Sequence, residues 1–470
     1  MQKKVPVEKG KKYEIDITGF GTGGEGVGRY AGFTVFVPYA LPGERVVVRV
    51  SEVRKNFARA DIVSIERASS DRVEPACPLY YECGGCQLQH MSYEAQLAAK
   101  RQQVSDALSH IGRQTDIEVL PTLGAADPWH YRNKMQFPIG LGHGKDKGHV
   151  VIGCFAKGSH DIINTDDCLI QRDGNNEILR AVREAVEELH ISVYDEDRHK
   201  GCLRHVVGRV GTNGDLMVCL VTATPKLPHA KELIKILRTK LPKMVSLQQN
   251  IQTYHNNVIM GRDTVLLWGK KTIKDQLGRL EFHISPRSFF QVNTAQAEVL
   301  YAKALEYANL KGEETVIDAY CGTGTITLYL ARKAAKAYGV EIVKPAIEDA
   351  RQNAYDNHIK NAEFQVGDAT KILPVYYKKG LRPDAIVVDP PRAGCTEKVL
   401  QTFAAMQPER IVYVSCNPAT LARDLAILEP LGYKATKAQP VDMFPMTAHV
   451  ECCTKIVRAD LLDKEKNMKD

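Results

Sequence analysis

The chain of 470 residues contains no apolar run long enough to span a membrane. Its first residues, MQKKVPVEKGKKYEI, lack the apolar core of a secretory signal peptide. No internal repeat is evident. These absences predict a cytoplasmic protein without a membrane partner. No obligate protein partner is evident either, and the sequence is silent on oligomeric state.

The chain contains twelve cysteines and has a modest net charge of +7. The cytosol keeps thiols reduced, so a disulfide framework is not expected and the cysteines need another explanation: metal binding, catalysis or burial. The first 67 residues hold 12 Lys and Arg against 8 Asp and Glu. This mild basic bias at the N-terminus is compatible with a polyanionic partner.

Residues 13–65 alternate apolar and polar side chains over short runs, which predicts a small OB-like β-barrel. The glycine-rich segment 21–32 is interpreted as a turn between strands. Arg54 and Arg59 flank Phe57, and cations beside an aromatic ring suit RNA. Charged strand edges that prevent aggregation explain the same residues equally well.

From residue 284 onward, apolar strand segments alternate with helical stretches, which is typical of a doubly wound, mostly parallel sheet. We therefore predict an α/β protein of three domains. These are a barrel (1–67), a mixed α+β central domain (68–283) whose helix at about 92–112 packs on the catalytic domain, and a Rossmann-like catalytic domain (284–470). The expected parallel strands are 314–320, 336–343, 362–368, 385–391 and 410–416.

A glycine turn, DAYCGTGT, follows the first of these strands, where open α/β sheets bind ligands. The third glycine of the dinucleotide fingerprint is missing, which disfavours a nicotinamide cofactor. Acids follow four successive strands, an arrangement that suits S-adenosylmethionine, with its hydroxyls and cationic centre. Single acids at strand ends can instead cap the following helices. The four acids are Asp318, Glu341, Asp368 and Asp389.

Three cysteines in the first half, Cys77, Cys83 and Cys86, share a loop with two glycines in the spacing C-x5-C-x2-C. Such spacing lets thiolates converge on one metal centre, which needs a fourth ligand from elsewhere. The spacing does not choose between zinc and an iron–sulfur cluster. Candidates for the fourth ligand are Cys154, Cys168 and Cys202.

Another cysteine, Cys416, stands at the end of a strand in IVYVSCNP, where it is packing, a metal ligand or a nucleophile. The motifs DAYCGTGT, VE, GDA, DPPR, SCNP and SPRSFFQVN together resemble those of the RNA (uracil-5-)-methyltransferases, which are class I methyltransferases. The resemblance implies that Cys416 is the nucleophile and that Glu451, in AHVECC, is the general base. It also implies that S-adenosylmethionine is bound by Gln291, Tyr320, Thr325, Glu341, Asp368 and Asp389.

The implied reaction explains why a thiol is needed. Carbon C5 of uracil is a poor nucleophile, but a thiolate that adds to C6 gives C5 carbanion character, so that C5 attacks a methyl donor. A base then removes the C5 proton and the thiolate leaves. At an ordinary pKa near 8.5, only roughly a few per cent of the thiol is ionised at neutral pH, so we expect the site to activate Cys416. Arg392 or Gln291 could orient the uracil edge.

The resemblance extends to the first half of the chain. It implies a [4Fe–4S] cluster on Cys77, Cys83 and Cys86, with Cys168 as fourth ligand and Cys154 as the alternative. We hypothesise that the cluster shapes an RNA-binding surface rather than transferring electrons. By the same resemblance the barrel is a TRAM domain, and barrel plus cluster favour 23S ribosomal RNA over transfer RNA. A flipped or unpaired uridine is required, because Cys416 cannot reach a base inside a helix.

Other functions fit parts of this pattern. A transfer-RNA uridine methyltransferase or a non-catalytic, metal-stabilised RNA-binding protein are the main alternatives. In DNA cytosine methyltransferases the nucleophile usually follows a proline, whereas Cys416 precedes Asn417-Pro418. Amino-group methyltransferases need an aromatic residue after Asp-Pro-Pro, where this chain has Arg392. The sequence does not identify the uridine or the number of uridines modified.

Overall fold

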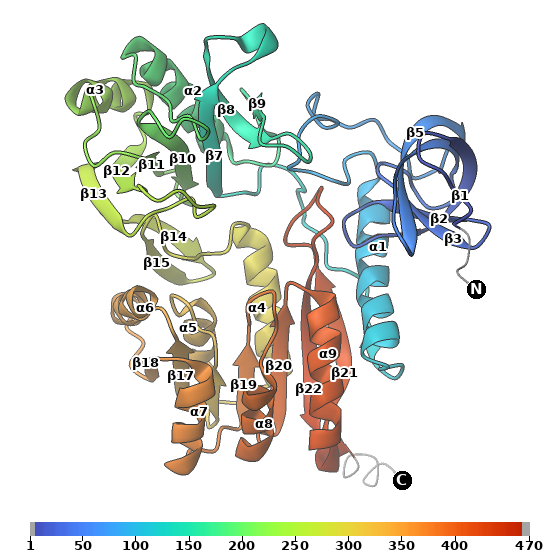
Figure 1. Cartoon of the computed structure of the whole chain (residues 1–470). Helices are drawn as coiled ribbons and strands as arrows, with labels where there is room; N and C mark the ends of the chain where they lie inside the picture. The colour runs from blue at the N-terminus through green and yellow to red at the C-terminus, as the bar shows by residue number, and fades with distance from the viewer. Residues whose placement is uncertain (1–4, 463–470) are drawn as a thin grey trace.

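In the computed structural model, which describes residues 5–462, a helix, α1, lies between a small barrel and a C-terminal α/β sheet, and a central sheet lies above the C-terminal one (Figure 1). The predicted terminal domains therefore include residues 1–4 and 463–470, which lie outside the described part. No helix within the described residues combines the length and the apolar character needed to cross a membrane. A cytoplasmic location stays a prediction.

The first five strands close into a barrel in the order β1-β2-β3-β5-β4, as the alternating pattern predicts. One interpretation was wrong, because strand β2 lies within the glycine-rich segment that was read as a turn. A Cβ at Gly28 would lie 2.4 Å from Ile15 Cγ2, so glycine is needed there for close strand approach. The strands are β1 (Lys12–Phe20), β2 (Gly26–Tyr30), β3 (Phe33–Val37), β4 (Arg45–Val53) and β5 (Phe57–Arg67).

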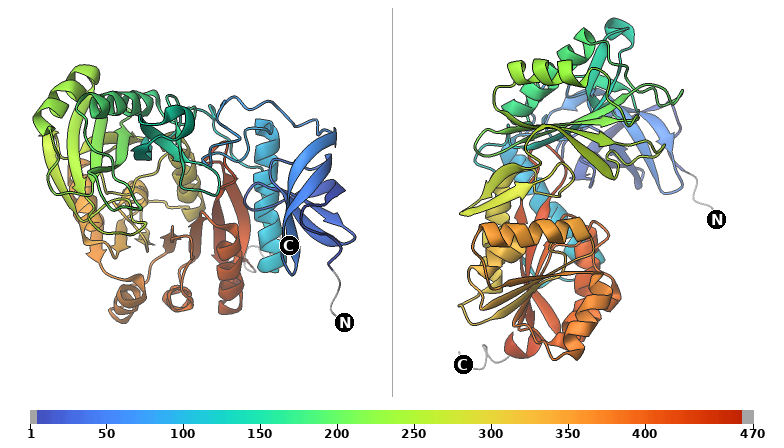
Figure 2. Two further views of the ribbon diagram at one scale, coloured as in Figure 1. Left: turned by 45° about the horizontal axis from the view of Figure 1, so that its top comes forward. Right: turned by 90° about the vertical axis from the view of Figure 1, so that its left-hand side faces the viewer.

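The central region is built on a seven-stranded mixed sheet in the order β13-β12-β11-β10-β7-β8-β9. The apolar faces of helices α2 and α3 pack on it and form its core. A hairpin of β14 and β15 then leads toward the C-terminal sheet (Figure 2). The bounds are β7 (Lys134–Leu141), β8 (Val150–Phe155), β9 (Ile162–Asn164), α2 (Asp173–Glu188), β10 (Leu203–Val210), β11 (Leu216–Thr222), α3 (Ala230–Lys240), β12 (Met244–Ile251), β13 (Asp263–Gly269), β14 (Ile273–Leu277) and β15 (Leu280–Ile284).

The C-terminal sheet has eight strands in the order β18-β17-β16-β19-β20-β22-β21-β6. The five predicted strands, β16 to β20, are mutually parallel, which confirms the doubly wound α/β class. Helices α4, α5 and α6 share the core on one face, and α7, α8 and α9 share that on the other. The bounds are α4 (Thr294–Ala308), β16 (Thr315–Asp318), α5 (Thr325–Ala331), β17 (Lys336–Glu341), α6 (Lys344–Asp356), β18 (Ala362–Val366), α7 (Ala369–Lys378), β19 (Ala385–Val388), α8 (Glu397–Met406), β20 (Arg410–Ser415), α9 (Pro418–Leu428), β21 (Tyr433–Val441) and β22 (Glu451–Arg458).

Residues from the first half of the chain complete this sheet. Helix α1 (Tyr93–Asp106), extended by a π-helical turn, lies along α9 and β21 (Figure 1). The short strand β6 (Glu118–Val119) then pairs in parallel with β21 at the sheet edge. The predicted domain boundary at residue 284 stays a prediction, but the sheet that carries the catalytic motifs is not made by residues 284–470 alone.

Candidate active site

The residues singled out from the sequence gather at one edge of the C-terminal sheet. Because β16, β17, β19 and β20 run parallel, their carboxyl ends lie at the same edge. Asp318 and Glu341 are the last residues of β16 and β17, and Asp389 and Cys416 directly follow β19 and β20. The edge thus brings together three of the four acids and the candidate nucleophile.

The turn after β16 is shaped by glycines in left-handed conformations, with φ of 53° at Gly322 and 84° at Gly324. A side chain at Gly322 would point into open space, so the backbone there is accessible to a ligand. The Glu341 carboxylate accepts hydrogen bonds from the backbone N–H of Gly322 at 3.2 Å and of Val343 at 2.8 Å. These contacts fix Glu341 beside the turn and leave it further acceptor capacity.

The other predicted cofactor residues surround the same turn. Gln291 is buried just before α4 and lies near the Tyr301 hydroxyl, which also contacts Thr325 Oγ1 at 3.3 Å. Tyr320 is half-buried beside Cys395. Asp368 caps helix α7, because its carboxylate accepts hydrogen bonds from the N–H and the hydroxyl of Thr370. The capping alternative therefore holds for Asp368, although its position beyond β18 stays compatible with cofactor binding.

Cys416 and Glu451 face each other across two antiparallel strands. Ser415 of β20 pairs with Cys452 of β22. Because the strands are antiparallel, the residue after Ser415, Cys416, lies opposite the residue before Cys452, Glu451. Cys416 is half-buried and Glu451 is 5% exposed. A half-buried thiol next to a buried carboxyl group is the arrangement that the two predicted roles require.

The electrostatics of this pair differ from the expectation of an activated thiol. Burial, with the negative charges of Glu451 and Asp389, raises the pKa of Cys416 to about 11, and Arg392 opposes this rise. Burial and Asp389 raise the pKa of Glu451 well above its ordinary value. Burial, and after it the two neighbouring carboxyl groups, therefore oppose ionisation of the thiol, and the expected activation of Cys416 stays a prediction.

Burial and neighbouring carboxyl groups also raise the pKa values of Asp389 and Asp318. Burial, with the charge of Asp318, raises the pKa of Asp389 to about 7, and burial raises that of Asp318 to about 7 as well. Asp318 accepts a hydrogen bond from Thr327 Oγ1 at 2.7 Å, while its other oxygen is buried without a partner among the described residues. A bound cation would relieve this repulsion.

The loop that carries Cys416 is tied to the loop that carries Asp389. Asn417 caps α9 and its side-chain amide donates to the backbone oxygen of Arg392 at 3.1 Å. Thr420 Oγ1 donates to the same oxygen at 3.2 Å. The SCNP and DPPR motifs thus form one structural unit at the sheet edge.

Comparison with known proteins identifies the family. The family model for tRNA (uracil-5-)-methyltransferase matches residues 92–459, and the TRAM domain model matches residues 6–63. An "Uncharacterized RNA methyltransferase" of Clostridium tetani is 51% identical over 467 residues, which cover 99% of this chain and 100% of the relative. A relative of that description from Halalkalibacterium halodurans is 49% identical, covering 96% of this chain and 98% of its own.

This chain belongs to the RNA (uracil-5-)-methyltransferase family. The resemblance drawn from the motifs is confirmed, and so is the TRAM domain, which supports RNA binding by this methyltransferase. A crystal structure of Pyrococcus abyssi tRNA (uracil-54, C5)-methyltransferase in complex with S-adenosyl-L-homocysteine matches with a TM-score of 0.74 and 29% identity. The match covers 95% of this chain and 100% of that one.

In this uracil-5-methyltransferase a second group of cysteines lines a cavity of about 470 Å³ between the 77–86 loop and the central sheet. Burial raises the pKa of Cys86 to about 12, and the nearby Cys168, Cys83 and Cys77 contribute to the rise. No three His, Cys, Asp or Glu side chains within residues 5–462 are already arranged as a metal site. The cavity cysteines are Cys77, Cys83, Cys86, Cys154 and Cys168. Cys202, the remaining candidate ligand, is buried in the central core instead.

Sequence reasoning missed the residues that surround the loop before Glu451. The loop 442–450 leads directly into Glu451, and its first residue, Asp442, forms a buried ion pair with Lys100 of α1. The available signal was Lys100 itself, with Gln96, on the face of a helix that buries Val104. Polar residues on a buried helical face are uncommon and point to a buried partner.

Proposed function

We propose that this methyltransferase transfers a methyl group from S-adenosylmethionine to C5 of uridine in RNA, with Cys416 as nucleophile and Glu451 as general base. The observation that carries the proposal is the pairing of Cys416 opposite Glu451 at the strand edge that also holds Asp389 and the glycine turn. A nucleophile alone would fit many enzymes. A thiol and a carboxyl group that are neighbours on adjacent strands fit a reaction with an addition and an elimination.

The residues around the glycine turn fit the methyl donor. Burial, together with the charge of Asp318, raises the pKa of Asp389 to about 7, and a cationic ligand beside these carboxyl groups would stabilise their ionised forms. We propose that Gln291, Tyr320, Thr325, Glu341, Asp368 and Asp389 hold S-adenosylmethionine. When bound, it supplies an electrophilic methyl group on a positively charged sulfur.

The chain's own groups act in sequence. The Cys416 thiolate forms a bond to C6 of the uracil, and electrons move onto O4 and C5, so that C5 can take the methyl group. Glu451 then removes the proton from C5, the C5–C6 double bond re-forms, and the bond from C6 to Sγ breaks to release the thiolate. Arg392 lowers the pKa of both groups, so that it favours their reactive, ionised forms.

We further propose 23S ribosomal RNA as the substrate, on the combination of the barrel with the cysteine cavity. Transfer RNA is the second candidate, because the Pyrococcus abyssi neighbour is named for it and matches along its whole length. Incubation of unmodified 23S transcript and of unmodified transfer-RNA transcripts with labelled S-adenosylmethionine separates the two. We expect 5-methyluridine in 23S RNA and none in transfer RNA.

The reverse pattern would assign the enzyme to transfer RNA. Label in neither RNA, or label at an exocyclic amine, would contradict uridine C5 methylation itself. Cys416→Ala protein, which lacks the proposed nucleophile, is the negative control for each RNA.

We also propose that Cys77, Cys83, Cys86 and Cys168 hold a [4Fe–4S] cluster. Soft thiolates are the donors such a cluster needs, and all four line one cavity. The cluster would provide cross-links between the 77–86 loop and the central sheet, and so shape the surface that meets RNA.

Protein purified without oxygen is therefore expected to contain about four irons per chain and to absorb visible light. Cys168→Ser should lower the iron content at least about twofold, whereas Cys154→Ser, the matched control in the same cavity, should not. Removal of iron should weaken RNA binding and leave cofactor binding intact. Iron loss in Cys154→Ser alone would contradict the ligand assignment, and zinc in place of iron would contradict the cluster.

A further inference from the structure

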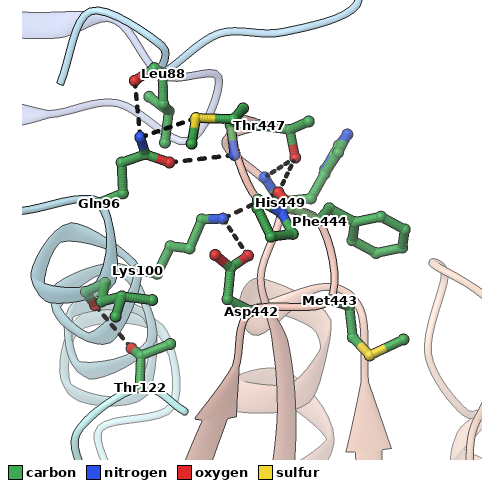
Figure 3. Close-up of polar contacts among 12 residues, drawn as sticks. Leu88, Gln96, Lys100, Thr122, Asp442, Met443, Phe444, Thr447 and His449 are labelled. Carbon is green, nitrogen blue, oxygen red and sulfur yellow. Dashed lines mark hydrogen bonds and ion pairs between the residues drawn. The ribbon is translucent and has the colours of Figure 1, made fainter. Parts of the chain in front are cut away.

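The loop 442–450 joins β21 to β22 and ends directly before Glu451, which pairs with Val441, the residue that precedes the loop. Figure 3 shows that side chains from α1 reach this loop. Lys100 Nζ donates to Asp442 Oδ1 at 2.5 Å and to the backbone oxygen of Phe444 at 3.2 Å (Figure 3). The Tyr93 hydroxyl donates to the second Asp442 oxygen at 3.0 Å. One end of the loop is thus fixed to α1 through the two oxygens of a single carboxylate.

Both charges of this pair are buried, with 1% of the Lys100 side chain and none of the Asp442 side chain exposed. Burying two charges costs much of what their attraction returns, and apolar residues of similar size often stabilise a protein equally well. Stability alone therefore does not explain the pair. A charged, directional contact does differ from an apolar one in that it sets the position of the group it holds.

The rest of the loop is held in the same manner. Gln96 Oε1 accepts from the Met446 backbone N–H at 3.2 Å, and Met446 has a φ of 67°, a left-handed conformation that is strained for methionine. On the opposite side, Gln296 donates to the Asp442 backbone oxygen at 3.1 Å and Asn293 to that of Met443 at 3.2 Å. The loop therefore adopts one conformation because α1 and the start of α4 hold it from two sides.

The nucleophile is supported separately. The loop after β20 that carries Cys416 is bound through Asn417 and Thr420 to the Arg392 backbone. Within residues 5–462, no hydrogen bond of Asn417 or Thr420 involves α1. A displacement of the loop 442–450 would therefore move Glu451 more than it moves Cys416.

We propose that Lys100 is a positioning residue, whose ion pair with Asp442 holds the Glu451 carboxylate where it can remove the C5 proton. This inference rests on the proposed function. If it is right, loss of the ion pair slows the second half of the reaction, in which the C5 proton leaves and the bond from C6 to Sγ breaks. Formation of the bond between Sγ and C6 and the methyl transfer to C5 are affected less. The methylated RNA then stays attached to Cys416.

The test is the ratio of covalent adduct to released 5-methyluridine product in a single turnover on ordinary uridine RNA with S-adenosylmethionine. The double variant Lys100→Met/Asp442→Asn removes both charges and leaves no uncompensated buried ion. We expect this ratio to rise at least tenfold over wild type. Tyr93→Phe, which removes a single hydroxyl donor, should raise the ratio at least threefold. Gln102→Met, at an exposed position of the same helix, is the control and should leave it unchanged.

A merely structural role would lower adduct and product together and leave their ratio unchanged, which would overturn the proposal for Lys100. A wild-type ratio in both Tyr93→Phe and the double variant would overturn it too. If wild-type protein gives no 5-methyluridine product, the proposed function fails, and this outcome is distinct from a failure confined to the α1 variants.

Discussion

Cys416→Ala is expected to lower the single-turnover rate of uridine methylation by at least about 10⁴-fold, because no other group can add to C6. Cys416 lies at the strand edge beside Asp389 and Glu451, whereas the other thiols nearby are buried in packing positions. S-adenosylmethionine binding should remain within about twofold of wild type, because Cys416 is outside the glycine turn. The measurement is label transfer to RNA, with cofactor affinity determined by calorimetry.

Cys452→Ala is the matched control, since Cys452 pairs with Ser415 one position away and is fully buried. Its rate should stay near wild type. Full activity in Cys416→Ala would remove covalent catalysis from the mechanism.

The wild-type rate of adduct formation on 5-fluorouridine RNA should also rise about tenfold per pH unit between pH 7 and 9. The sign follows because the thiolate is the reactive form and the pKa of Cys416 is about 11.

Glu451→Gln is expected to separate the two halves of the reaction. Without a carboxylate the C5 proton is not removed, so release of methylated RNA should slow by about 10²- to 10⁴-fold. Adduct formation should be at least as fast as in wild type, because the negative charge of Glu451 raises the pKa of Cys416 and glutamine carries none. Denaturing electrophoresis of labelled RNA should therefore show a stable protein–RNA band.

The control for this prediction is Glu397→Gln, which makes the same chemical change at an exposed position in the first turn of α8. It should show no stable band. A Glu451→Gln variant that neither forms the adduct nor releases product would indicate a role in binding. A Glu451→Gln variant that releases product at the wild-type rate would mean that another base removes the C5 proton.

The strands of the C-terminal sheet could be predicted closely because each is a short apolar run ended by a motif. The barrel was also predicted, except for β2. Its glycines predict a turn, but Gly28 allows two strands to lie close together. Local sequence cannot distinguish a glycine in a turn from a glycine that makes room for a neighbouring strand, since only the position of that strand reveals the need for room. The strand edge that gathers Asp318, Glu341 and Cys416 follows from parallel pairing and needed no tertiary information.

The electrostatics and the supports of the site could not be predicted. The raised pKa of Cys416 depends on how close Glu451 and Asp389 lie after folding. The ion pair of Lys100 with Asp442 joins residues 342 positions apart, and no local pattern relates them. The role of Asp368 as a helix cap was foreseen only as an alternative, because a cap and a cofactor ligand use the same residue type.

The pairing of β6 with β21 has a consequence for biosynthesis. Residues 118–119 leave the ribosome more than 300 positions before their partners, residues 437–438. At about 5–20 residues per second, the edge of β21 can be covered only some tens of seconds after β6 has been made. During that time Lys100 of α1 has not met Asp442, so the face of α1 that holds this lysine becomes buried only when translation is nearly finished.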